Sequence, residues 1–376
     1  MGRKRILLYC HDGVGLGHLR RISRIAAKLQ QRYSCLVATG VREALWLVPD
    51  ECEILKLPSW EGIDRSRARR RGRVPAIEMD RQEAVAFRSE LLMATARSFT
   101  PDAILVDYRP FGNFGELREM LSGTAAKKYL IHRGISDTSD GSELAGSATE
   151  EIADTYDRIM VVADPRLSDL AMTDRYCPRA AAKIEYCGYI VPETTRISID
   201  SARNVVCSGG GGFGSEELMT ACLRAADHNP YIPMCIVLGP RSRMAAQDLG
   251  GIPSHVKFLK STMDLGELHA SAAVVVSSGG YNSVLEAISG GARIIIHPNQ
   301  RGSDDEQERF AEALSTYYPI RIVRELGALS GAIQEEYELF SKCGKASFQL
   351  AIQGLSRILA IISKDIENHQ DSSCVG

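Results

Sequence analysis

The sequence of 376 residues lacks long apolar runs and has little net charge. No stretch approaches the roughly 18 consecutive apolar residues of a membrane-spanning helix. Lys and Arg number 45 against 47 Asp and Glu, so the formal net charge is -2 and no overall attraction to nucleic acid or anionic lipid is expected. With 44% hydrophobic residues the chain can bury a sizeable core, and its length predicts two domains.

The ten cysteines contain no Cys-x-x-Cys pair. Cys10, Cys207 and Cys235 lie inside apolar, strand-like runs, which favours reduced thiols in a cytoplasmic protein. Behind the basic N-terminus the apolar run is about five residues long, shorter than the roughly 7–15 residues of a signal peptide. A cytoplasmic location is therefore expected.

Short apolar runs alternate with stretches of helical period, which is typical of parallel sheets covered by helices. Both halves of the chain show this doubly wound α/β pattern. Strands are predicted near Arg5–Cys10, Cys35–Thr39, Ile54–Lys56, Ala103–Val106, Lys128–Ile131 and Ile159–Val162, and again near Asn204–Ser208, Met234–Leu238, Val256–Phe258, Ala273–Ser277 and Arg293–His297.

The same pattern predicts the domain boundaries. A first Rossmann-like domain is expected over residues 1–190 and a second over 203–342, joined by a polar linker over 191–202 that contains Pro192. Apolar residues at three- and four-residue spacing predict a final helix over Cys343–Lys364, within a C-terminal segment that spans 343–366.

The stretch "HDGVGLGHLRR" follows the first predicted strand and opens a helix. Glycines between a strand and a helix let an anion approach free backbone N–H groups at the positive end of the helix dipole. A dinucleotide fingerprint is disfavoured, because His18 occupies the place of its third glycine and the second strand ends Ala38-Thr39-Gly40 without an acidic residue. A purely structural tight turn remains the alternative.

Two further glycine turns occur in the second half. Gly209–Gly212 follow one predicted strand, and Ser278–Gly280 follow another. Three such turns spread over two domains predict one ligand held in the cleft between them, and glycine-rich turns suit a pyrophosphate. Glu286, in the helix after Ser278–Gly280, could accept hydrogen bonds from a ribose; the alternative is a solvated helix glutamate.

Two segments carry a resemblance to a known family. "GVGLGHLRRISRIAAKL" and "SSGGYNSVLEAISGGARIIIHPNQRGSDDEQERFAEAL" resemble the GT-B glycosyltransferases of the MurG type, which make N-acetylglucosaminyl linkages from a UDP-sugar. The sequence is more similar still to a group of bacterial predicted glycosyltransferases, and the resemblance spans about residues 4 to 315. It implies a GT-B fold: two Rossmann-like domains facing a cleft, with a C-terminal helix that crosses back to the first domain.

The resemblance also implies donor-binding residues. One departure is the second glycine loop, which lacks the glutamine that MurG enzymes place after Gly-Gly-Ser. The implied diphosphate, ribose, sugar and uracil contacts are Gly15, Gly17, Arg133, Gly209, Gly210, Gly211, Gly212, Leu259, Met263, Ser278, Gly279, Gly280, Tyr281, Glu286, Glu306 and Gln307.

Sugar transfer needs a base for the acceptor hydroxyl and stabilisation of the leaving diphosphate. His18 is the candidate base because it lies on the glycine loop and imidazole titrates near neutral pH, and Asp107 at the end of a neighbouring strand could orient it. His18 could instead donate only to phosphate. His11, Asp12, His132 and His297 also fall at strand ends, where structural roles are expected. No Asp-x-Asp motif ends a strand, so a metal-independent reaction with no cofactor beyond the UDP-sugar is expected.

The run "RSRARRRGR", Arg65–Arg73, carries six arginines in nine residues. It is either a solvated loop or a flap that binds an anionic acceptor through Arg69, Arg70 and Arg71.

Together these features predict an inverting transferase. It would move a hexose or N-acetylhexosamine from a UDP-sugar, with UDP-GlcNAc favoured, to a small or carrier-bound hydroxylated acceptor in secondary-metabolite (for example antibiotic) or cell-envelope biosynthesis. The alternatives are a nucleotide-sugar 2-epimerase or UDP-sugar hydrolase on the same fold, and a non-catalytic ancillary partner protein. Neither a nucleic-acid partner nor a membrane span is expected.

Overall fold

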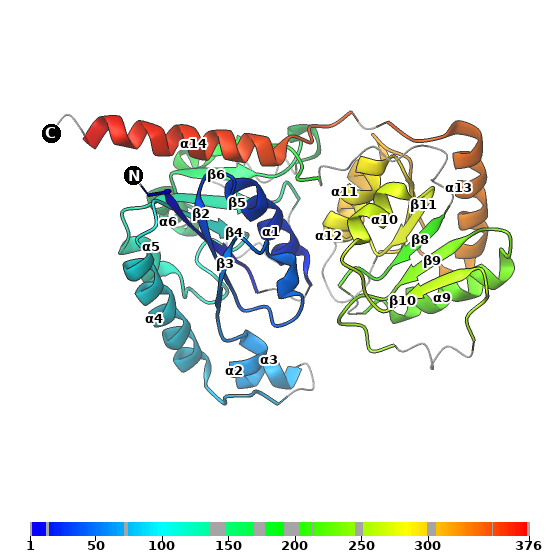
Figure 1. Cartoon of the computed structure of the whole chain (residues 1–376), viewed down its shortest axis with the longest axis horizontal. Coiled ribbons are helices and arrows are strands. Elements are labelled where there is room, and N and C mark those ends of the chain that lie inside the picture. The colour runs from blue at the N-terminus through cyan, green and yellow to red at the C-terminus, as the bar shows by residue number, and fades with distance from the viewer. Residues whose placement is uncertain are drawn as a thin grey trace. The chain divides into compact units, whose positions relative to one another are not determined.

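The computed structural model describes residues 2–12, 15–70, 74–135, 147–168, 177–191, 204–211, 214–244, 251–298, 306–347 and 349–373. For residues 67, 69, 70, 147, 148, 306 and 368–373 only the backbone is described. The chain forms two compact units, each built on its own parallel sheet (Figure 1). Unit 1 comprises β1 to β7 together with the C-terminal helix α14, and unit 2 runs from β8 to α13.

Unit 1 is built on a seven-stranded sheet in the order β3-β2-β1-β4-β5-β6-β7, in which every pair of neighbours is parallel. Its strands are β1 (Arg5–Cys10), β2 (Ser34–Thr39), β3 (Glu53–Lys56), β4 (Ala103–Asp107), β5 (Lys127–His132), β6 (Arg158–Val161) and β7 (Ile184–Tyr186). Its helices are α1 (Gly17–Leu29), α2 (Trp60–Ile63), α3 (Arg65–Arg70), α4 (Arg81–Phe99), α5 (Arg118–Ser122), α6 (Ser147–Thr155), α8 (Pro178–Ala181) and α14 (Gly354–Ser373), with 3-10 turns at η1 (Leu45–Leu47) and η3 (Pro165–Leu167).

Unit 2 repeats this plan on a six-stranded parallel sheet in the order β10-β9-β8-β11-β12-β13. Its strands are β8 (Val205–Ser208), β9 (Met234–Val237), β10 (Val256–Leu259), β11 (Val274–Ser277), β12 (Arg293–Ile296) and β13 (Ile320–Ile322). Its helices are α9 (Glu216–His228), α10 (Leu265–Ser271), α11 (Tyr281–Gly290), α12 (Glu306–Ser315) and α13 (Leu329–Cys343), with a 3-10 turn at η6 (Leu326–Ala328).

The predicted fold class, two doubly wound α/β halves, is confirmed, and each predicted strand is present. The sequence pattern did not predict two strands, β7 and β13. Strand β7 is an edge strand of the unit 1 sheet, and β13 is an edge strand of the unit 2 sheet. Both are three residues long, alternate apolar with polar side chains, and are only partly buried. Such segments lack the continuous apolar run that marks a strand buried on both faces.

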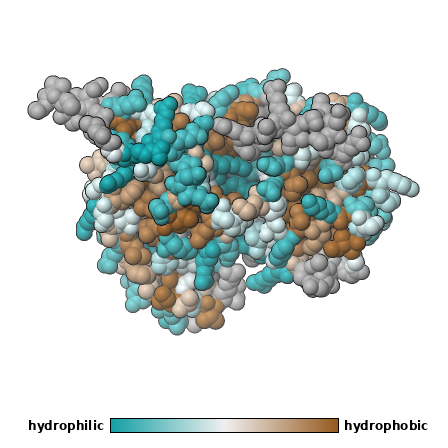
Figure 2. Space-filling view, viewed as in Figure 1, coloured by the Kyte–Doolittle hydropathy of each residue, from teal (hydrophilic) through white to brown (hydrophobic). Residues whose placement is uncertain are grey.

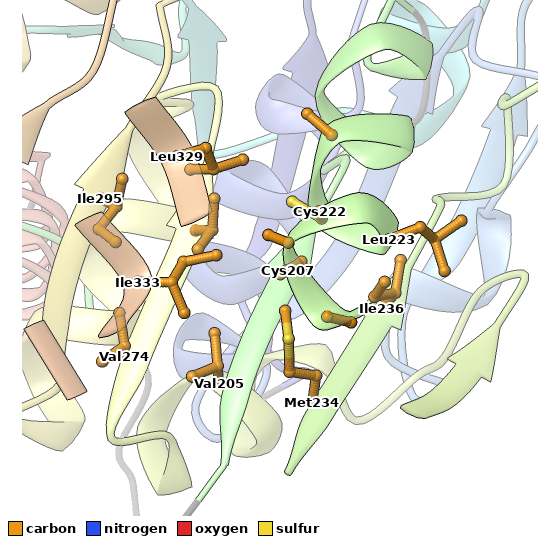
Figure 3. Packing of buried hydrophobic residues seen from close by; sticks show 14 of the residues in the cluster. Val205, Cys207, Cys222, Leu223, Met234, Ile236, Val274, Ile295, Leu329 and Ile333 are labelled. Carbon is orange, nitrogen blue, oxygen red and sulfur yellow. The ribbon is translucent and has the colours of Figure 1, made fainter. Parts of the chain in front are cut away.

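The core of unit 2 shows why the strand ends are held firmly. Apolar side chains from β8, β9 and β11 pack against those of α9 and α13, including Cys207 with Cys222 and Val274 with Ile333 (Figure 3). Because this packing fixes the strands and helices of unit 2, the turns that leave the carboxyl ends of β8 and β11 start from rigid positions.

The C-terminal helix packs on unit 1. The single helix expected over Cys343–Lys364 is wrong in its start, because α13 already ends at Cys343 and α14 begins only at Gly354. Gly344 has φ of 70°, a left-handed conformation that ends α13. Helix α14 packs on α1 (Figure 1). Its Asp365 carboxylate accepts hydrogen bonds from Arg158 Nε at 2.6 Å and Tyr129 Oη at 3.2 Å.

The first part of the arginine run is helical, not a loop. Residues Arg65–Arg70 form α3, in which Ala68 is fully buried and Ser66 N donates to Asp64 Oδ1 at 2.8 Å. The side chains of Arg69 and Arg70 and the whole of Arg71 lie outside the described residues, so their predicted acceptor contacts stay a prediction.

Apolar and hydrophilic side chains are interspersed on the face shown in Figure 2. Across the described segments, no helix combines the length and the apolar character needed to cross a membrane.

Gly290 generates a prediction for the stability of unit 2. It lies where α11 meets α10, and a Cβ there would overlap the backbone of Ala270. Gly290→Ala should therefore lower the free energy of unfolding by about 1–3 kcal/mol, the range for overpacking. Gly331→Ala is the matched control: it also lies in a helix, α13, but a Cβ there meets nothing within 4 Å, so a gain of about 0.5–1 kcal/mol is expected. Denaturant unfolding of both variants measures the difference, and equal effects would contradict the packing account.

Candidate active site

The site in unit 1 lies where the order of its sheet reverses. Strands β1 and β4 are neighbours there, and the chain leaves β1 toward α1 on one side while β4 and β5 continue on the other. Crevices at the carboxyl ends of strands at such a switch point are the usual ligand sites of open α/β sheets. His18, near the start of α1, and Asp107, the last residue of β4, meet at this edge.

Three side chains form a buried hydrogen-bonded group. His18 Nδ1 lies 2.7 Å from Asp107 Oδ2, while Arg21 donates to Asp107 Oδ1 from Nε at 2.8 Å and from Nη2 at 2.6 Å. Asp107 is fully buried, Arg21 is 1% exposed and His18 8% exposed. His18 and Arg21 are three residues apart on α1, so they project from one face of the helix toward the same carboxylate.

Contacts at both ring nitrogens show where His18 carries its proton. Arg133 Nη2 lies 2.9 Å from His18 Nε2. A carboxylate can only accept, so the neutral imidazole carries its proton on Nδ1, from which it is donated to Asp107, although Arg21 Nη2 also lies 3.0 Å from Nδ1. Nε2 is then the acceptor that the guanidinium of Arg133 requires. The neutral ring therefore has its lone pair on Nε2, as a general base requires.

Burial and charge keep this group in the protonation states that a base needs. Burial lowers the pKa of His18 from 6.5 to about 4, against the opposing attraction of Asp107 and with smaller lowering contributions from Arg133 and Arg21. Burial opposes ionisation of Asp107, but the charge of Arg21, together with His18, holds the pKa of its carboxyl well below the usual range. At neutral pH the site thus holds a neutral imidazole beside an ionised carboxylate.

Aromatic rings pack around His18. Tyr108 has a ring centroid 5.2 Å from that of His18 and 5.6 Å from that of His11, and the His11 ring lies edge-on to His18 at 4.6 Å. His132 stacks on Tyr108 at 5.8 Å. Tyr108 adopts a φ of 68°, a conformation that non-glycine residues rarely take, while its N–H donates to Ile131 O at 2.8 Å. Backbone strain of this kind is often found at functional sites.

The other strand-end residues make structural contacts. Asp12 accepts from Trp60 N at 3.2 Å, His132 Nδ1 lies 2.7 Å from Arg133 O, and His297 Nδ1 lies 2.8 Å from Val323 O.

Unit 2 has its own switch point, between β8 and β11, and two glycine turns lie there side by side. Ser208 and Ser277 are register partners at the ends of these strands. Each hydroxyl accepts from the backbone N–H two residues on, Gly210 N and Gly279 N, at 3.2 Å in both cases. Gly210 and Gly279 have φ of 57° and 84°, so both turns need the left-handed region that glycine adopts freely.

The first of these turns has little space for a side chain. A Cβ at Gly209 would overlap Leu238 O and Ser215 Oγ, and Gly211 O accepts from Arg241 N at 3.0 Å. Gly212 lies outside the described residues.

The second turn meets helix α12. A Cβ at Gly279 would lie 2.9 Å from Ile296 Cγ2 and 3.6 Å from Gln307 Cβ, whereas one at Gly280 would meet nothing within 4 Å. Tyr281 stacks on Phe310 of α12 with centroids 5.0 Å apart. The structure thus brings together Gly279, Tyr281 and Gln307, three predicted donor contacts; the side chain of Glu306 is outside the described set.

Glu286 is fully buried, so the alternative of a solvated helix glutamate is wrong. Its Oε2 lies 2.9 Å from Nδ1 of His269 on α10, which is also fully buried. Gly266 of α10 borders the same carboxyl, since a Cβ there would lie 3.7 Å from Glu286 Cδ, an ordinary contact distance. His269 on α10 thus anchors the carboxylate of Glu286 on α11.

The remaining predicted donor residues are more open. Leu259 ends β10 and is partly exposed, and Met263 is 68% exposed. In unit 1, Gly15 is exposed and Gly17 is the first residue of α1. The described residues contain no group of three or more His, Cys, Asp or Glu that could hold a metal ion.

Sequence reasoning missed Arg21 and His269. Arg21 had a detectable signal: it is an arginine three residues after His18 on the apolar face of an amphipathic helix, where only a buried counter-charge could balance it. His269 carried no such signal, since its partner Glu286 lies on a different helix.

Comparison with known proteins gives one sequence relative and many structural ones. No protein-family profile matches the chain. An uncharacterized glycosyltransferase of Methanosarcina acetivorans is 24% identical over 267 residues, which cover 66% of this chain and 70% of the relative.

The solved structures share the fold over nearly the whole chain at low identity. MurG of Acinetobacter baumannii superposes with a TM-score of 0.58 at 14% identity, covering 96% of this chain and 99% of MurG. The calicheamicin glycosyltransferase gives 0.60 at 14% identity with 98% of both chains covered. Arabidopsis thaliana UGT89C1 complexed with UDP gives 0.63 at 14% identity, with 97% and 100% covered. The chain therefore has the fold of the GT-B glycosyltransferases, and the sequence relative that it matches is named a glycosyltransferase.

Proposed function

We propose that the chain is an inverting transferase that moves a hexose or N-acetylhexosamine from a UDP-sugar, with UDP-GlcNAc favoured, to a hydroxylated acceptor. The observation that carries this proposal is the buried His18–Asp107–Arg21 group at the carboxyl edge of the unit 1 sheet. His18 Nε2 takes the proton of the acceptor hydroxyl as its oxygen attacks the anomeric carbon. The bond from that carbon to the diphosphate oxygen breaks, UDP leaves with the electron pair, and the single displacement inverts the anomeric centre.

The donor is assigned to unit 2. Its two glycine turns present the backbone at the ends of β8 and β11, where a diphosphate can approach without meeting a Cβ. The relative that was solved with UDP shares this fold, which supports a uridine nucleotide. Glu286, anchored by His269, is assigned the ribose hydroxyls, and Gln307 on α12 the donor sugar.

The test is incubation with UDP-GlcNAc and related donors, with and without a panel of hydroxylated acceptors, followed by mass spectrometry and NMR of the sugar. UDP release that depends on an acceptor, with an inverted anomeric centre in the product, supports the proposal. A changed sugar without UDP release would indicate an epimerase, UDP release that no acceptor enhances would indicate a hydrolase, and no binding of any sugar nucleotide would overturn the donor assignment.

His18→Asn should lower turnover of bound donor by roughly 10²–10⁴-fold, the contribution of general acid–base catalysis. Asparagine can still donate to Asp107 but has no lone pair in place of Nε2. UDP affinity should stay unchanged in calorimetry. His255→Asn, at a histidine that contacts Ala226 O in unit 2, is the control and should keep full turnover. If UDP binding collapses in the His18 variant while bound donor turns over normally, His18 binds phosphate and is not the base.

The pH profile follows from the lowered pKa of His18. Only the neutral imidazole accepts a proton, and a pKa of about 4 keeps it neutral from neutral pH down to about pH 5. The ratio kcat/KM, which reports the free protein, should thus be independent of His18 titration over that interval and fall only as the pH approaches 4. An acidic limb with a midpoint near the ordinary 6.5, absent in His18→Asn, would show that the ring is not held neutral by its surroundings.

Glu286→Gln should weaken UDP binding by about 1.5–3 kcal/mol, the scale for losing hydrogen bonds to a charged group. The substitution keeps the volume of this fully buried side chain, so the fold is preserved. Glu336→Gln is the matched control, because Glu336 is a buried glutamate of the same unit that pairs with Arg293. Calorimetry with UDP measures both, and equal affinities in the two variants would remove Glu286 from the ribose site.

A further inference from the structure

Arg133 donates a hydrogen bond to the nitrogen of His18 that the proposed reaction must use. Its Nη2 lies 2.9 Å from His18 Nε2, the only nitrogen of the neutral ring that can take a proton. An acceptor hydroxyl needs the same lone pair, at a donor–acceptor distance of about 2.6–3.2 Å. The guanidinium and the hydroxyl cannot both occupy this position.

The Arg133 side chain is more accessible than that of the other arginine at His18. Its guanidinium carbon, Cζ, lies 4.8 Å from the centroid of the Tyr108 ring, and its side chain is only partly buried. Arg21, by contrast, is 1% exposed and donates twice to Asp107. Of the two arginines at His18, Arg133 is thus the more exposed, which makes it the candidate to move.

Charge shows what would draw it away. A guanidinium donates from a planar fork of N–H groups, a geometry that matches the oxygens of a phosphate. Phosphate oxygens form charge-assisted and often bidentate hydrogen bonds with a guanidinium, which are stronger than a bond to a neutral ring nitrogen.

We propose that Arg133 is a reversible cap on the general base: it covers His18 Nε2 in the ligand-free protein and is drawn off by a phosphate-type anion, so that the base becomes available only when charged substrate is bound. The proposal deepens the proposed function and rests on it for the identity of the base. The anion is either the diphosphate of the donor or a phosphate on the acceptor. Arg133 is a positioning residue here, because it acts through His18. Capping would suppress wasteful hydrolysis of the donor by water.

The test follows the histidine nitrogens by NMR in protein labelled with ¹⁵N-histidine, with the His18 signals assigned by their loss in His18→Asn. The parent, Arg133→Met and Arg133→Lys are each titrated with inorganic pyrophosphate, with UDP and with a sugar monophosphate. Pyrophosphate and UDP probe the donor as the source of the anion, and the monophosphate probes the acceptor. Unchanged His255 signals show that a variant is folded.

In the parent, at least one anion should shift the His18 Nε2 signal by removing its hydrogen-bond donor. In Arg133→Met the signal should already be shifted without anion and should no longer respond, and Arg133→Lys should restore part of the response. The groups that face His18 are Asp107, Arg21, Arg133, His11 and Tyr108, and losing the Arg133 charge should move the His18 titration to higher pH. Arg133→Met should also release UDP from UDP-GlcNAc without acceptor several-fold faster than the parent.

The outcomes separate the two proposals. A His18 Nε2 signal that ignores all three anions in the parent, or that responds equally in Arg133→Met, overturns the cap. An anion-dependent, Arg133-dependent shift in a protein that turns over no sugar nucleotide would retain the cap and overturn the proposed transferase.

Discussion

The ion pair between Asp107 and Arg21 is the constraint on which the unit 1 site depends. Both groups are buried, and a buried charge is tolerated only when it is paired and its remaining hydrogen-bonding atoms are satisfied. Asp107 meets that requirement with two bonds from Arg21 on one oxygen and one from His18 on the other. Helix α1 therefore has to sit with its first turns against the end of β4. The same contact that satisfies the charge also determines the tautomer of His18.

Unit 2 has the same strand order as the first six strands of unit 1 but different residues at its switch point. At both switch points a short loop links a central strand to a helix, β1 to α1 in unit 1 and β8 to α9 in unit 2. In unit 1 the neighbouring strand ends in the Asp107 carboxylate, which accepts from the His18 imidazole. In unit 2 both strands end in a serine whose hydroxyl accepts from the glycine N–H two residues on. One architecture thus places a buried charged group at the switch point of unit 1 and two glycine turns at that of unit 2.

The sequence predicts the fold well because long, buried parallel strands are continuous apolar runs, as β1 and β11 show. It misses β7 and β13 because a short edge strand has no such run. It starts the final helix at Cys343 instead of Gly354, because apolar residues such as Ala351 and Ile352 continue the helical spacing ahead of α14. His18 and Asp107 were predictable as a pair, since strand ends of one parallel sheet meet at one edge. Arg133 was assigned to phosphate, and its contact with His18 Nε2 could not be foreseen, because it depends on a side-chain direction that no spacing encodes.

The central claim is that Asp107 acts through His18, and a double-mutant cycle on turnover of bound UDP-GlcNAc tests it most directly. His18→Asn, Asp107→Asn and the double variant are compared with the parent at a temperature where all four are folded, because Asp107→Asn leaves Arg21 without its counter-charge. Residues that work as one unit are strongly non-additive, so the double variant should turn over no more slowly than His18→Asn alone. If the two losses multiply, Asp107 contributes independently of the imidazole and the account of the site is wrong.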